Sequence, residues 1–364
     1  MKWVLVWGCL WFSCLATPAL AEDRVVNVYN WSDYVAEDTI ANFTAATGIK
    51  VVYDVYDANE TLEAKLFAGR TGYDVVFPSA HPFAGRHIAA GLYATLDKSQ
   101  LPNLKHLDPM MEKILQAMDP GNAHLVPYMW GTTGIGYNVA KVKALLGEQA
   151  PRNSWELLFN PQYAAKLADC GISLLDDEQE ALGAALLYLG KDANSTSAED
   201  IAAAAEVINK VRPYIRYFHS SQYINDLANG DICVAHGYSG DVLQARDRAE
   251  EAGQGVQVAY SIPREGAIMW IDVMAIPADA PHPEEAHAFI NYLLEPQVIA
   301  GISNYVAYAN PNKDATALLD EGIRNDPSIY PPDEVMARLV VPTAMPNKIQ
   351  RLKTRTWTRI KTGY

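Results

Sequence analysis

The segment that follows the N-terminal apolar stretch alternates between strands and helices, and this alternation restricts the folds open to the chain. β-branched and aromatic residues predict strands over residues 24–31, 50–56 and 73–78. Helices are expected between them, over residues 39–47 and 60–68. Such an order forms βαβ units on a parallel sheet that is covered on both faces. Ligands of open α/β sheets bind beyond the carboxyl ends of the strands.

Local signals mark the ends of these first helices. Asp38 and Asn59 stand where an N-cap is expected, because their side chains can accept backbone N–H bonds. Gly48 and Gly69 follow the last turns. The carboxyl ends of the first and third strands fall at residues 31–33 and 78–80, so ligand-binding residues are sought there first.

The rest of the chain predicts a second α/β unit. Residues 128–138 are rich in glycine and aromatic residues and predict a strand that crosses between two lobes. A length of 364 residues exceeds one ordinary core, and no flexible linker is present, so the chain is expected to cross more than once. Further helices are expected over residues 178–189, 198–210, 221–228 and 284–294 and after Pro331, with strands over 231–236, 256–262 and 267–277.

Residues 1–21 have the pattern of a cleaved signal peptide. Lys2 precedes a nearly continuous apolar run, and Ala19-Leu20-Ala21 matches an A-x-A cleavage site. An uncleaved anchor and a lipoprotein processed at Cys9 or Cys14 are the less favoured alternatives. No later stretch reaches 18 apolar residues. The sequence therefore predicts export.

Two cysteines remain after cleavage, Cys170 and Cys233. An oxidising compartment favours their pairing. A disulfide there would close a loop of roughly 60 residues, which stabilises the fold by about 4 kcal/mol in the chain-entropy model. The alternative is a pair of buried free thiols. Two cysteines alone cannot form a structural zinc site, and the eight histidines show no HExxH pattern, so no metal site is expected.

The charge balance and the glycine motifs argue against several function classes. Asp and Glu number 43 against 29 Lys and Arg, a net charge of −14, which suits neither DNA nor RNA but can attract cations. The glycines from Gly131 to Gly136 lack the spacing of a dinucleotide or phosphate loop. Residues 237–240 fall one residue short of a nucleophile elbow. No cofactor and no enzyme activity are therefore expected.

Acidic and aromatic residues recur together near expected strand ends and helix starts. An ammonium ion binds both aromatic faces and carboxylates, and each buried ammonium needs its own acid. Separate acid clusters across a cleft therefore favour a linear diamine or polyamine. The clusters are Trp31, Asp33 and Tyr34; Tyr238 and Asp241; Trp270 and Asp272; and Asp177 with Glu180.

Several segments resemble the periplasmic polyamine-binding proteins of ABC transporters, with the putrescine-binding members closest. The similarity covers nearly all of the chain after the signal peptide. It is carried by Trp31-Ser32-Asp33-Tyr34, Pro78-Ser79, residues 128–138, 217–231 and 261–266, and Tyr330-Pro331-Pro332.

The resemblance implies a fold and a way of working. The fold is the type II periplasmic binding protein fold, an α/β architecture with a ligand cleft between two lobes and crossing hinge strands. Residues 22–133 with about 257–309 would form lobe 1, and about 134–256 with 310–364 would form lobe 2. A protein of this kind closes around its ligand in the periplasm, and we expect a monomer because such closure needs no second subunit. It then passes the ligand to an inner-membrane permease.

The resemblance also assigns roles to individual residues. Trp31, Tyr34 and Tyr308 match aromatic walls of the ligand channel. Ser32, Asp33 and Ser79 match polar contacts, Glu180 matches an acid of the second lobe, and Asp241 and Asp272 match ammonium-binding acids.

The pocket also departs from the putrescine type. Tyr238 stands where relatives usually have Trp, and His81 where they have Ser or Tyr, while Trp270 and Asp177 resemble the spermidine type. Putrescine is therefore expected together with spermidine, cadaverine or agmatine as alternatives. An amine sensor that acts through a signalling partner is a further alternative. A ligand with a carboxylate would need an arginine in the cleft to bind it, and no arginine stands beside the four acid clusters in the sequence.

Overall fold

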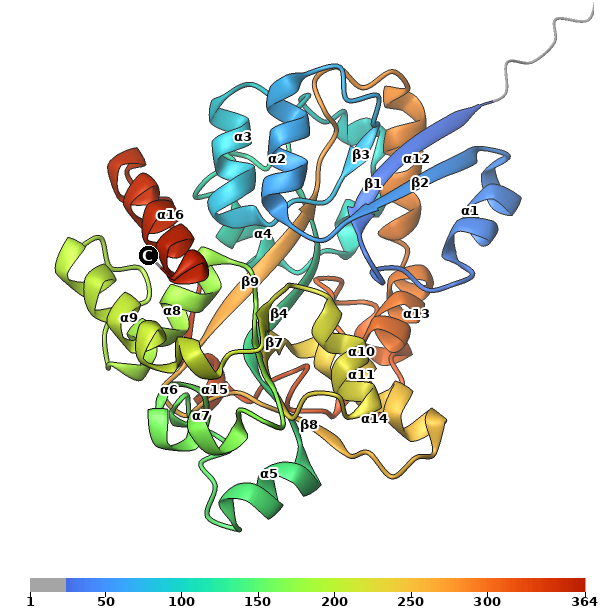
Figure 1. The fold of residues 1–364 in the computed structure, drawn as a ribbon. Coiled ribbons are helices and arrows are strands. Elements are labelled where there is room, and N and C mark those ends of the chain that lie inside the picture. Colours follow the sequence, from blue (N-terminus) through green and yellow to red (C-terminus); the bar gives the residue numbers. More distant parts are fainter. Residues whose placement is uncertain (1–23, 364) are drawn as a thin grey trace, which may run out of the picture.

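A computed structural model describes residues 24–363 as an α/β molecule built around two sheets (Figure 1). The expected signal peptide, residues 1–21, lies outside the described residues. No helix in the described range is long and apolar enough to cross a membrane.

The first sheet confirms the βαβ pattern. Strands β1 (Val25–Trp31), β2 (Lys50–Tyr56) and β3 (Val75–Val76) are parallel in the order β2-β1-β3. Helices α1 (Thr39–Thr47) and α2 (Asn59–Ala68) connect them.

The second sheet is organised by two long antiparallel strands. Strands β4 (Val126–Asn138) and β9 (Ala267–Met274) pair from Val126–Met274 to Thr133–Ile268. The order is β10-β9-β4-β7-β5-β6, and β8 also pairs with β4. At its far end β9 reaches the first sheet through bridges between Ala275 and Val76 and between Asp272 and Ser79. Figure 1 shows both strands running from the first sheet towards the opposite half of the molecule.

The remaining elements complete the layers around these sheets. The other strands are β5 (Ile172–Leu174), β6 (Tyr217–Phe218), β7 (Val234–Tyr238), β8 (Val258–Ser261) and β10 (Leu339–Val340). The helices up to the middle of the chain are α3 (Gly85–Ala89), α4 (Pro109–Leu115), α5 (Val139–Leu146), α6 (Glu156–Phe159), α7 (Pro161–Leu167), α8 (Glu178–Tyr188) and α9 (Ala198–Val211). Those that follow are α10 (Gln222–Asn229), α11 (Ser239–Ala252), α12 (Pro283–Leu293), α13 (Pro296–Val306), α14 (Glu321–Arg324), α15 (Asp333–Met336) and α16 (Asn347–Thr362).

Two large apolar cores and a smaller third cluster, formed by side chains of α10, α11, β7 and β8, hold the molecule together, which is consistent with the expected two-lobed fold. The first core contains Val26, Val28 and Phe289, and it also contains Ile329 near the C-terminus. The second core contains side chains of β5, α8 and α9 together with Trp357 of α16. The lobe boundaries expected from the sequence stay a prediction.

The expected disulfide joins Cys170 and Cys233, whose Cα atoms lie 5.6 Å apart. The two cysteines precede the neighbouring strands β5 and β7. The bond therefore ties together the starts of two strands that are far apart in sequence.

Asp38 occupies the N-cap position of α1, as expected, but its side chain makes no capping bond to the backbone and accepts from the Asn42 side chain instead. The expected cap at Asn59 is wrong. Asn59 is already the first residue of α2, and its side chain bonds to Ser79. A tertiary contact thus competes successfully with the local cap at Asn59.

Candidate ligand-binding site

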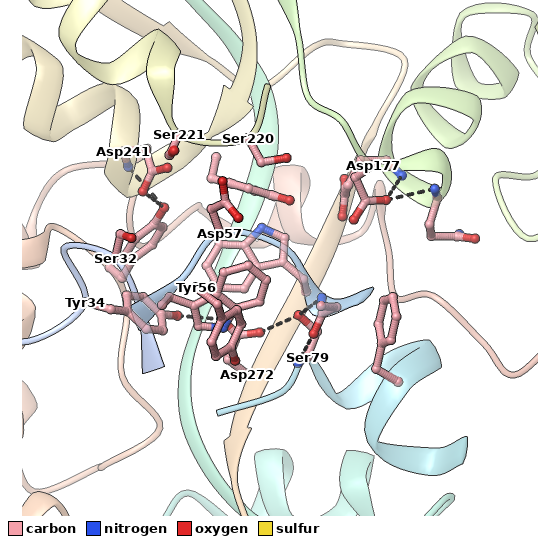
Figure 2. A pocket seen from close by; sticks show the side chains of 18 of the residues that line it. Ser32, Tyr34, Tyr56, Asp57, Ser79, Asp177, Ser220, Ser221, Asp241 and Asp272 are labelled. Atoms are coloured by element: carbon pink, nitrogen blue, oxygen red, sulfur yellow. Dashed lines mark hydrogen bonds between the residues drawn. The ribbon is translucent and has the colours of Figure 1, made fainter. Parts of the chain in front are cut away.

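A cavity with roughly 750 Å³ of space, open to solvent, lies where both sheets end (Figure 2). Its walls include every site residue expected from the sequence except Asp33. The expected residues that line it are Trp31, Ser32, Tyr34, Ser79, Asp177, Glu180, Tyr238, Asp241, Trp270, Asp272 and Tyr308.

Asp272 is a buried carboxylate on β9 that accepts two hydroxyl hydrogen bonds. Tyr34 donates to Oδ2 at 2.8 Å, and Ser79 donates to Oδ1 at 2.7 Å. Asn59 fixes Ser79 in turn, because it accepts the Ser79 backbone N–H and donates to the Ser79 hydroxyl. Burial raises the pKa of Asp272 to about 7.

Asp241, in the first turn of α11, is held in the same manner. Tyr223 donates its hydroxyl to Oδ2 at 2.8 Å, and Tyr308 donates to Oδ1 at 2.6 Å. Burial raises the pKa of Asp241 to about 6. Each of these two carboxylates is therefore oriented by two hydroxyls and keeps acceptor capacity for a cation.

A third group of acids, here called the acid end, consists of Asp177 and Glu180 at the start of α8. Asp177 caps this helix, since its Oδ1 accepts the backbone N–H groups of Gln179 at 2.8 Å and Glu180 at 3.0 Å. Within the described range, Glu180 Oε2 is buried and has no hydrogen-bond partner. Burial is the main cause that raises the pKa of both carboxyls. In Figure 2, Asp177, Asp241 and Asp272 stand apart from one another around the cavity.

Aromatic rings form the walls between the carboxylates. The Trp270 ring meets Tyr308 edge to face at 5.1 Å and Tyr238 at 5.7 Å between centroids. Trp31 packs against Tyr56 at 4.7 Å and is fixed by a 2.8 Å bond from its indole N–H to the Phe77 carbonyl. The rings are thus held in place before any ligand enters.

Two glycines make room for these rings. A Cβ at Gly131 would lie 2.7 Å from the Trp270 ring, and one at Gly240 would lie 2.6 Å from the Tyr308 ring. Contacts this short do not occur at a real Cβ, so either side chain would displace a wall of the cavity. The glycine-rich character of β4 therefore has a steric cause at Gly131.

The electrostatics of the cavity favour a cation. None of the described residues that line it is a lysine or an arginine. The lining residue His81 is neutral at pH 7, because burial lowers its pKa to about 4. A partly dry, acidic and aromatic cavity can bind an ammonium group, and none of its described lining residues offers a cationic partner to a carboxylate ligand.

Comparison with known proteins gives the family. The model of the bacterial extracellular solute-binding proteins matches residues 38–331. The putrescine-binding periplasmic proteins of Escherichia coli and Pseudomonas aeruginosa are each 54% identical to the chain. The first alignment covers 100% of this chain and 98% of the relative, and the second covers 94% and 93%. The chain belongs to the bacterial extracellular solute-binding proteins.

The fold agrees with this family. The spermidine/putrescine substrate-binding protein of a Streptococcus pneumoniae ABC transporter superposes with a TM-score of 0.75 at 29% identity, over 93% of this chain and 99% of that one. The expected two-lobed α/β fold is thereby confirmed. Like its relatives, this solute-binding protein is periplasmic and is not an enzyme.

Asp33 is the expected site residue that the solute-binding protein places elsewhere. It does not line the cavity, its side chain is about half exposed, and it pairs with Arg248 at 3.3 Å. Its backbone has a positive φ of 53°, a conformation that aspartate tolerates better than most residues. The turn after β1 thus points Ser32 and Tyr34 inward and Asp33 outward.

Other lining residues were missed by the sequence reasoning. Tyr56 and Asp57 stand at the carboxyl end of β2, so the rule applied to the first and third strands could have found them. Ser220 and Ser221 follow β6 in the same way. No local signal marks the others, which are Asn59, Pro82, Phe83, Gln179, Ile224 and Pro342.

Proposed function

We propose that the protein captures putrescine or a related linear polyamine in the periplasm and delivers it to the permease of an ABC transporter. The observation that carries the proposal is a pair of carboxylates, the buried Asp272 and the partly buried Asp241, which face one aromatic cavity. Each has two hydroxyl donors, and no described lysine or arginine lines the cavity to neutralise them.

A linear amine satisfies this arrangement better than other small cations. Each ammonium end can donate to a carboxylate in a charge-assisted hydrogen bond. The methylene chain between the ends can lie against Trp31, Trp270 and Tyr308 and lose its water. A compact cation would satisfy one carboxylate and leave the other buried without a partner, which is costly.

The named relatives support the amine class without choosing one member. Two relatives at 54% identity are called putrescine-binding, and another of Pseudomonas aeruginosa at 46% is called putrescine/agmatine-binding. The acid end offers carboxylates beyond Asp241 and Asp272, so it can serve an additional ammonium group such as that of spermidine.

Delivery to a permease requires a protein that opens and closes. The strands β4 and β9, which connect the two halves, are the natural hinge elements. A single chain supplies the whole cavity, which supports action as a monomer.

A thermal-shift and calorimetry panel tests the proposal. The mature protein is titrated with putrescine, cadaverine, agmatine, spermidine and spermine, with glutamate as the control ligand. At least one amine should raise the unfolding midpoint as RT ln(1 + [L]/Kd) requires, and glutamate should leave it unchanged. A panel in which no amine raises the midpoint would reject the polyamine ligand.

A further inference from the structure

The C-terminal helix α16 holds the start of α8 from behind the cavity. One face of α16 carries Gln350, Lys353, Thr354, Trp357 and Lys361, at the spacing of a single helical stripe. Figure 1 shows α16, in red, beside α8 and α9.

The contacts of this stripe fall on the residues that flank the two acids of the cavity. Gln350 donates to Glu178 Oε1, and Thr354 donates to the same atom at 3.0 Å. Two further donors reach Asp176 Oδ1, the Trp357 indole N–H at 2.9 Å and Lys361 Nζ at 2.5 Å. Held at Asp176 and Glu178, the first turn of α8 presents the acid end, Asp177 and Glu180, to the cavity.

Lys353 is the member of the stripe whose burial demands an explanation. Its side chain is fully buried, and its Nζ donates to Gln179 Oε1 at 3.1 Å. Gln179 itself lines the cavity, and its amide nitrogen is buried without a partner in the described range. A buried ammonium is costly unless negative groups surround it, and here those groups belong to the start of α8.

The charged groups that act on Lys353 and on the acids before it come from several elements. Burial lowers the pKa of Lys353 to about 8, and the nearby carboxyls of Glu178, Asp177 and Asp192 oppose this shift, Glu178 most strongly. The other charged groups of this neighbourhood are Asp176 and its partner Lys361, Glu60 and Glu63 of α2, and Arg86 of α3.

We propose that Lys353 is a positioning residue for the ligand. From behind the cavity its ammonium orients Gln179 and favours the charged form of the neighbouring carboxyls at the start of α8, so that the acid end can receive an ammonium group of the ligand. This inference rests on the proposed amine function, because it assumes that an ammonium group reaches the acid end. It assigns a binding role to a residue that does not line the cavity.

The proposal makes the pH dependence of binding the decisive readout. Without the Lys353 charge, the acid-end carboxyls should hold their protons to higher pH, and an arriving ammonium must then displace them. Removal of the neighbouring negative charge at Glu178 should have the opposite effect. A merely structural role would weaken binding at all pH values and would not produce shifts of opposite sign.

The experiment measures Kd for spermidine and for putrescine by calorimetry between pH 5.5 and pH 9. The variants are Lys353→Met, Lys353→Arg and Glu178→Gln, and Lys348→Met on the exposed side of the same helix is the matched control. For at least one ligand, Lys353→Met should move the pH midpoint of binding upward by about one unit and weaken binding about tenfold at pH 7. Lys353→Arg and Lys348→Met should follow the parent protein, and Glu178→Gln should move the midpoint downward.

Superimposable profiles of Lys353→Met and the parent protein for both ligands would overturn the inference. If Lys353→Met does not fold, Lys353→Gln takes its place, since it also removes the charge but keeps a polar group, and an unmoved midpoint overturns the inference. A parent protein that binds neither amine would instead reject the proposed function. The two failures are therefore distinguishable.

Discussion

The carboxylates of Asp241 and Asp272 have no positively charged partner among the described residues that line the cavity. Each has two hydroxyl donors, yet burial holds their pKa values at about 6 and about 7, well above the range of an exposed aspartate. The hydroxyls therefore orient these carboxylates without replacing a counter-charge. An ammonium ligand supplies that charge, and its arrival should release protons at neutral pH.

Replacement of either carboxylate should weaken amine binding. We expect Asp272→Asn and Asp241→Asn each to cost about 2 kcal/mol or more, roughly thirtyfold in Kd, because an ammonium loses its charged partner in a buried site. Calorimetry at pH 8.5, where both acids of the parent protein are ionised, measures the loss. Asp231→Asn, at an exposed position, is the control. Unchanged affinity in both site variants would contradict the assigned roles.

The same carboxyls predict how the stability of the ligand-free protein depends on pH. Their folded pKa values lie above the unfolded value of about 3.9, so the folded state binds more protons. Their contribution to stability is fully present below pH 4 and is lost as pH rises through about 6 and about 7. The unfolding free energy of the ligand-free protein should therefore fall between about pH 4 and pH 7.

Denaturant unfolding at several pH values, with and without saturating putrescine, measures this fall. Bound ammonium should reduce it, because the ligand favours the charged carboxyls, and Asp272→Asn should reduce it in the ligand-free protein. A fall of the same size in Asp272→Asn would show that other groups cause it.

At the scale of elements, the sequence was informative wherever local patterns decide the structure. The alternation of residues 24–78 predicted β1 to β3 and their helices, and strand ends located Trp31 and Ser79. Asp272 was found through its closeness in sequence to Trp270. Local sequence signals gave the wrong prediction, or none, where a contact with a residue distant in sequence determines the structure. Asn59 holds Ser79 instead of capping α2, and Pro342 reaches the cavity from the far end of the chain.

A matched pair of helical glycines tests how the elements shape the cavity. Gly240→Ala in α11 should weaken amine binding at least tenfold, because the new Cβ would displace the Tyr308 ring that lies 2.6 Å from its position. Gly301→Ala in α13 meets nothing within 4 Å. It should leave the affinity unchanged and raise helix stability by up to about 1 kcal/mol. Calorimetry measures the amine affinity of both variants, and thermal unfolding measures their stability. Equal affinities of the two variants would contradict the packing argument.

The disulfide joins the starts of two strands, and its two cysteines are 63 residues apart in the sequence. Replacing both Cys170 and Cys233 by alanine should lower the unfolding free energy by about 4 kcal/mol, because the unfolded chain regains the freedom of the closed loop. Neither cysteine lines the cavity, so amine affinity should change little. Urea unfolding and calorimetry of the double variant test the two statements separately. A large loss of affinity in a folded variant would contradict the second.

For the whole molecule, the cavity between two separately packed cores predicts closure on ligand. The halves are connected by β4 and β9. Asp272 lies on β9, which packs in the first core, and it shares a cavity with Asp241 on α11, most of whose buried side chains pack in the third cluster with α10. A ligand that bridges these acids should draw the halves together. Small-angle X-ray scattering should show a smaller radius of gyration with a saturating amine, and Asp241→Asn should reduce the change. An unchanged radius with bound amine would contradict closure.

The interleaved path of the chain also limits how such a molecule can evolve. The two cores alternate along the chain, because the first draws on side chains from Val26 to Ile329 and the second on side chains from Ile135 to Ile360. A single recombination breakpoint therefore cannot exchange one half of the molecule for that of a relative. Ligand preference in this architecture should instead diversify through point substitutions around the cavity, on a scaffold that is inherited as one piece.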